Sequence, residues 1–82
     1  MKRVYVEEPV RGSDRDLLRI KTAAWDDDAV ALAYCWPTKN GTVAHGCELP
    51  LEVLRQAIEL AVRHGFLTPG DVLRAVADAL ER

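Results

Sequence analysis

The sequence predicts an α+β domain in which a four-stranded antiparallel sheet precedes two helices that pack on one face of the sheet. Three features support this fold class. Residues 2–49 contain runs that alternate between the two sides of a strand, residues 50–82 carry apolar side chains at helical spacing, and an Asn-Gly dipeptide separates two of the alternating runs. Strands followed by helices are typical of α+β proteins. Since 82 residues suit one domain, we expect residues 1–82 to form a single domain.

The first two strands are predicted from period-two alternation. Val4 and Val6 lie on one side of residues 2–8, and Pro9 ends this run because proline cannot donate to a ladder. Residues 16–25 alternate in the same way and form the second predicted strand.

Turn chemistry predicts how the remaining strands connect. The aspartate run Asp26-Asp27-Asp28 favours a tight turn into a third strand at 29–36. Asn40-Gly41 suits the centre of a two-residue type I′ turn, in which both central residues need a positive φ. That turn would pair Trp36 with His45, Tyr34 with Cys47, and Leu32 with Leu49. One face would then be bulky and the other would be built from Ala31, Ala33, Cys35, Ala44, Gly46 and Glu48, and the sequence leaves open which face is buried.

Capping residues delimit the two predicted helices. Pro50 suits the first position of a helix over 50–64, and Gly65 is a good helix stop. Thr68 and Asp71 have the spacing of a capping box, so a second helix is expected from about Pro69 to the end of the chain.

Composition narrows the function classes. The net charge is −2, with 13 acidic against 11 basic residues, whereas nucleic-acid-binding proteins usually carry a basic surface. No stretch approaches the roughly 20 apolar residues of a membrane span, and two cysteines are too few for a disulfide scaffold. We therefore expect a cytoplasmic protein without membrane or nucleic-acid partners. The abundance of Arg, Ala, Leu, Val and Asp is typical of GC-rich coding, and hence of a bacterium or its phage.

Catalytic, metal and cofactor sites are not predicted. The soft metal ligands are Cys35, His45, Cys47 and His64, and they lack the paired spacing of a zinc site. No glycine-rich phosphate loop or hydrolase motif is present. The predicted register does place His45 and Cys47 on one face, two residues apart, so a small enzyme or ligand-binding protein that uses these two residues stays an alternative.

The predicted function is that of a small, non-catalytic regulatory or inhibitory protein that binds another protein. Tryptophan is a frequent interface anchor, and an aspartate cluster can contact a basic partner. The predicted interaction residues are Trp25, Asp26, Asp27, Asp28, Trp36 and His45. A homodimer is also expected, because the small apolar core favours cover by a second copy.

A second alternative comes from a resemblance. The stretch from Glu48-Leu49-Pro50 through Gly65, followed by Asp71–Val76, resembles the ribbon-helix-helix repressors. The resemblance implies a dimer whose paired strands enter the DNA major groove. The sequence departs from the family because the link between the helices looks one residue long and the strand lacks basic or amide side chains. At the positions where the family's strand contacts DNA, this sequence has Thr42, Ala44, Gly46 and Glu48.

Overall fold

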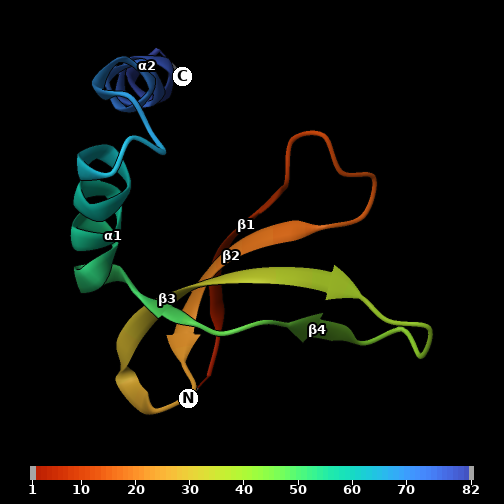
Figure 1. Cartoon of the computed structure of the whole chain (residues 1–82). Coiled ribbons are helices and arrows are strands. Elements are labelled where there is room, and N and C mark those ends of the chain that lie inside the picture. Colours follow the sequence, from red (N-terminus) through yellow and green to blue (C-terminus); the bar gives the residue numbers. More distant parts are fainter. Residues whose placement is uncertain (1, 82) are drawn as a thin grey trace. The chain divides into compact units, whose positions relative to one another are not determined.

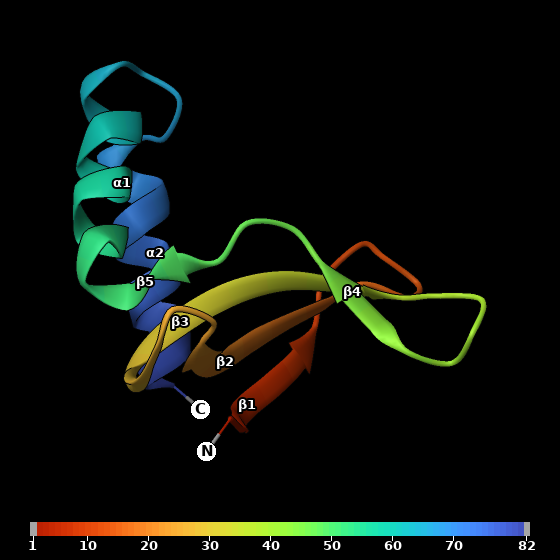
Figure 2. The ribbon, with the colours of Figure 1, turned by 90° about the horizontal axis from the view of Figure 1, so that it is seen from below.

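The computed structural model describes residues 2–81 and confirms the α+β class, with an antiparallel sheet followed by two carboxy-terminal helices (Figure 1). The elements are β1 (Val4–Pro9), β2 (Leu17–Ala23), β3 (Asp26–Pro37), β4 (Val43–His45), β5 (Leu49–Pro50), α1 (Leu51–Arg63) and α2 (Pro69–Leu80). The sheet order is β1-β2-β3-β4, and β5 also pairs with β3 (Figure 2). The chain divides into a sheet unit, up to Glu52, and a helix unit, from Val53 onward. The single domain and the packing of the helices on the sheet stay predictions.

The predicted turn at Asp26-Asp27-Asp28 is wrong, because β3 begins at Asp26, opposite Ala23. The turn consists of Ala24 and Trp25 instead. The aspartates tolerate extended backbone here because their side chains are exposed: the Asp28 N–H donates to Asp26 Oδ1 (2.9 Å), and Asp27 forms an ion pair with Lys2 (3.0 Å).

The two-residue type I′ turn at Asn40-Gly41 is also wrong. The Thr38 N–H donates to the Thr42 carbonyl (2.8 Å), so the loop contains three residues, and Gly41 alone within it has a positive φ (79°). This is the three-residue hairpin loop with a left-handed glycine.

The extra loop residue moves β4 by one position relative to β3. Cys35, rather than Trp36, therefore lies opposite His45. The predicted pairing of Leu32 with Leu49 is confirmed, because an additional residue between β4 and β5 restores the register there. Between the two paired stretches, the three residues 46–48 stand against two residues of β3, Ala33 and Tyr34.

The small-residue face of β3 is the buried one. Ala33 is only 1% exposed, and Ala31 and Cys35 are equally covered. Arg19 of β2 lies opposite Ala33, and Lys21 lies opposite Ala31. Long basic side chains bury their carbon stems while the charged ends reach solvent, so they can cover a row of small residues.

Both predicted helix ends in the helix unit are confirmed. Gly65 has a positive φ (80°), and the Phe66 N–H donates to the Ala61 carbonyl (2.8 Å), which are marks of a Schellman termination. At the start of α2 the Thr68 hydroxyl accepts from the Asp71 N–H (3.0 Å), and the Asp71 carboxylate accepts from the Thr68 N–H (3.1 Å). The link between the helices contains residues 64–68, close to the 65–68 that the predicted helix bounds leave. The one-residue link noted against the ribbon-helix-helix resemblance is therefore wrong.

Candidate interaction surfaces

Helix α1 is apolar around more than half of its circumference. At about 100° per residue, its polar side chains fall on one side and leave an apolar arc about 200° wide. The polar residues are Glu52, Arg55, Gln56, Glu59 and Arg63. One packed neighbour covers a stripe of roughly 100°, so the arc of α1 has room for two neighbours.

The two halves of this arc differ in exposure. One half is partly covered and consists of Leu51, Leu54, Ile58, Ala61 and Val62. The other half contains Val53, Ala57 and Leu60, of which Leu60 is 53% exposed. No residue of α1 is buried.

Helix α2 is amphipathic in the same way. Its acidic and basic residues, Asp71, Arg74 and Asp78, lie on one side. The opposite side carries Val72, Leu73, Val76 and Leu80, and again no residue of the helix is buried. Leu73 is 69% exposed and Leu80 is 81% exposed.

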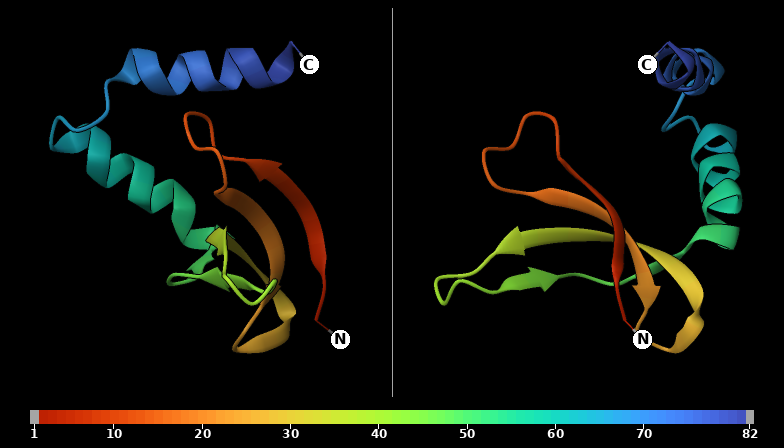
Figure 3. Two further views of the ribbon diagram at one scale, coloured as in Figure 1. Left: turned by 90° about the vertical axis from the view of Figure 1, so that its right-hand side faces the viewer. Right: turned by 180° about the vertical axis from the view of Figure 1, so that it is seen from behind.

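The apolar arcs of the two helices do not cover each other. In the described chain, α1 and α2 leave the 64–68 link in different directions and do not pack along one another (Figure 3). An open groove of about 380 Å³ lies at the end of α1, lined by Ala57, Leu60, Ala61, His64 and the exposed Phe66. We call the apolar arcs together with this groove the helix surface.

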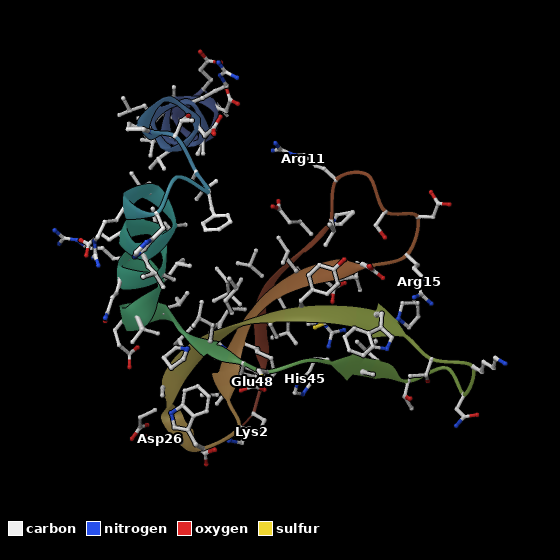
Figure 4. All side chains as sticks on the ribbon, viewed as in Figure 1. Lys2, Arg11, Arg15, Asp26, His45 and Glu48 are labelled. Carbon is white, nitrogen blue, oxygen red and sulfur yellow. The ribbon has the colours of Figure 1, made fainter. Side chains whose placement is uncertain are left out.

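A band of paired charges covers the small-residue face of the sheet. Arg19 forms an ion pair with Glu7 (2.5 Å), and Lys21 pairs with Glu48. The His45 Nε2 lies 3.6 Å from the Glu48 carboxylate, and Figure 4 shows these two labelled side chains next to one another. The His45 ring also donates through Nδ1 to the Gly46 carbonyl (2.8 Å).

Glu48 is the most buried charge in this band, with 4% of its side chain exposed. Desolvation raises the pKa of Glu48, but the hydrogen bond from Lys21, the bond from the Ala24 N–H (2.8 Å) and the nearby positive charge outweigh it. The pKa of Glu48 therefore lies below its ordinary value, and the carboxylate stays ionised in the folded protein.

This carboxylate makes the stability of the sheet depend on pH. Because folding lowers the pKa of Glu48 below 4.5, its contribution is complete above about pH 5 and is lost as the pH falls through the folded-state value. We expect the free energy of unfolding, followed by tryptophan fluorescence, to decline below about pH 5. Glu48→Gln should make the decline shallower without abolishing it, since a hydrogen bond from Lys2 also lowers the pKa of Asp27. Parallel declines for wild type and variant would contradict this role of Glu48.

The predicted interaction residues do not form one cluster. Trp25 is exposed in the β2–β3 turn, beside the exposed aspartates at the start of β3. Trp36 is half-buried near the other end of β3, and His45 lies on the charged face. Figure 4 shows the labelled Asp26 and Lys2 at the amino-terminal end of the sheet. The interaction role of these residues stays a prediction.

The thiols do not adopt the predicted arrangement around His45. Cys35, which was predicted on the opposite face, lies directly opposite His45, and Cys47 is exposed between β4 and β5. Both cysteines are free, and burial raises the pKa of Cys35. Among residues 2–81 no group of three metal-ligating side chains comes together.

The ribbon-helix-helix resemblance assigns one strand to DNA contact. In the structure this strand pairs with β3 at Val43–His45 and again at Leu49 and Pro50. Comparisons with models of known families, with curated proteins and with solved structures give no match for this chain. None of the helices within residues 2–81 has the length and apolarity needed to cross a membrane.

One feature was missed in the sequence, and a second was visible there but was not given a role. The Lys21–Glu48 pair joins residues 27 positions apart, and no local pattern signals it. The width of the α1 arc was visible, because Val53, Ala57 and Leu60 continue the apolar stripe around the helix. That width is the signal that distinguishes a helix with two neighbours from a helix with one.

Proposed function

We propose that this chain is a small, non-catalytic protein that acts by binding another protein through the helix surface. The observation that carries the proposal is that α1 and α2 bury no residue although each presents a wide apolar arc. Large exposed apolar patches on small proteins mark interaction sites, and amphipathic helices commonly bind partners through such faces.

The charges on the helices define the kind of partner. The charged side chains of α1 lie on its polar side, where Arg55 and Glu59 form an exposed ion pair (3.2 Å). The arcs themselves carry no acidic residue and no lysine or arginine. A partner therefore needs an uncharged apolar face, such as one side of an amphipathic helix, because a charge placed there would be desolvated without compensation.

The chain's own sheet is the competing occupant of the helix surface. One sheet face covers one stripe of a helix, whereas the arc of α1 is about twice as wide as such a stripe. The half of the arc that contains Leu60 therefore offers a partner a face of its own.

The test compares two substitutions on α2. Affinity capture with the full chain should recover a partner, and Leu73→Glu should reduce its recovery by at least about tenfold, since a charge would enter an apolar interface. Arg74→Glu, on the polar side of the same helix, should leave recovery unchanged. Equal recovery with both variants would refute binding through the helix surface, as would failure of an apolar fluorescent dye to bind the wild-type chain.

A further inference from the structure

Strand β1 is an open edge of the sheet. It pairs with β2 alone among the described residues, and every one of its residues is exposed. Val4, Tyr5 and Val6 follow one another along this edge, and Val6 is 56% exposed. Figure 2 shows β1 at the margin of the sheet unit. Such an edge offers unpaired backbone donors and acceptors to another strand.

The charges along this edge are arranged by sign. Lys2 and Arg3 precede the apolar residues, and Glu7 and Glu8 follow them. Arg3 stacks over the Tyr5 ring (4.2 Å) and forms no ion pair within residues 2–81. Glu8 likewise has no charged partner in the described part of the chain.

We propose that β1 pairs antiparallel with β1 of a second copy of this chain, so that the two sheets join across a two-fold axis. Antiparallel pairing of a segment with itself brings the basic start of each strand to the acidic end of the other. Parallel pairing would align like charges, which is unfavourable for directly opposed side chains. The order of charges along β1 therefore favours a second copy of β1 as the partner strand, and it favours the antiparallel orientation.

The bulge in β1 sets the register. The Thr22 N–H donates to the Arg3 carbonyl (2.8 Å), and the Arg3 N–H donates to the Thr22 hydroxyl (3.0 Å). Arg3 therefore lies opposite Thr22 and Glu8 lies opposite Leu18, so Arg3 and Glu8 belong to the same face of the sheet. Without the irregularity between Val4 and Val6 they would lie on opposite faces, being five positions apart. In the dimer Arg3 lies opposite Glu8 of the second copy, and this ion pair occurs twice.

The apolar surface beside the edge adds to the contact. A groove of about 110 Å³ lies next to β1, lined by Val6, Leu18, Ile20 and Leu32 together with Glu8 and Arg19. Across the two-fold axis the grooves of both copies approach each other. This surface is distinct from the helix surface, so the dimer and the proposed function can fail separately.

The test uses charge reversal and its rescue. By sedimentation equilibrium at low salt, the wild-type chain should have twice its 9.1 kDa mass. Arg3→Glu and Glu8→Arg should each weaken dimerisation at least about tenfold, because each places like charges together at two sites. The double variant should dimerise again, and an equimolar mixture of the two single variants should form a heterodimer.

Three results would overturn the proposal: a wild-type chain that is monomeric at millimolar concentration, single variants that dimerise like wild type, or loss of dimerisation without rescue in both the double variant and the mixture. Leu73→Glu is the matched control for the helix surface. If that substitution abolishes the dimer while Arg3→Glu leaves it intact, the second copy binds the helices and the β1 pairing is wrong.

Discussion

Replacing Lys21 with methionine is expected to lower the free energy of unfolding of the sheet unit by about 3 kcal/mol, because it leaves a buried carboxylate without its cation. Glu48 would keep the bond from the Ala24 N–H, but its charge would lose the closest compensating group. Methionine retains an apolar stem over the small residues beneath, so loss of cover contributes little. A protein of this length has a total stability of only about 4–12 kcal/mol, so the effect is large.

Urea unfolding followed by tryptophan fluorescence reports the unfolding of the sheet unit, because Trp25 and Trp36 both belong to that part of the chain. Arg15→Met is the control within the same unit: it breaks an ion pair whose arginine side chain is 67% exposed, and it should cost less than about 1 kcal/mol. The double variant Lys21→Met, Glu48→Leu should recover much of the loss, because the carboxylate is no longer present. If Lys21→Met is as stable as wild type, Glu48 is not desolvated in the folded protein.

The features that the sequence predicted well depend on a few neighbouring residues. The capping box requires only Thr68 and Asp71, three positions apart, and the end of α1 requires a glycine that accepts a positive φ. In both cases the residue that carries the signal is also the residue that makes the hydrogen bond or adopts the conformation. Tertiary structure has little influence on such ends.

The hairpin register could not be derived from Asn40-Gly41 alone. The dipeptide indicates a turn with a left-handed glycine, and both the two-residue and the three-residue loop satisfy that requirement. In this structure two threonines close the three-residue loop. The Thr38 and Thr42 hydroxyls lie 2.7 Å apart, beside the backbone hydrogen bond between the same residues. One residue of difference was enough to place His45 opposite Cys35 rather than Trp36.

The buried face of the sheet could not be predicted because its cover comes from charged side chains. Alternation separated the small face from the bulky face correctly in β3, but side-chain hydrophobicity alone favours burial of the bulky face. The cover of the small face depends on Lys21 pairing with Glu48, which is a long-range contact. Ala33 lies opposite Arg19, which pairs with Glu7 of another strand, so the surroundings of this buried alanine are set by contacts across the sheet and not by strand periodicity.

Ala33→Leu is expected to lower the free energy of unfolding of the sheet unit by about 1–3 kcal/mol, because the larger side chain would enter a closed layer. Ala33 is opposite Arg19 and lies among the charged side chains that cover the small face. A leucine here must displace Arg19 from Glu7 or separate Lys21 from Glu48. Either displacement exposes small residues to water and strains the paired charges.

Tyr34→Leu is the control for this prediction, since Tyr34 is the next residue of β3 and its side chain lies on the other face. Tyr34 is exposed, and its hydroxyl donates to the Asp16 carboxylate at the surface, so its replacement should cost less than Ala33→Leu. Tryptophan fluorescence in urea measures both variants under the same conditions. If Tyr34→Leu proves more costly than Ala33→Leu, the bulky face contains the core of the sheet, and the charged band is a surface feature over a loosely packed layer.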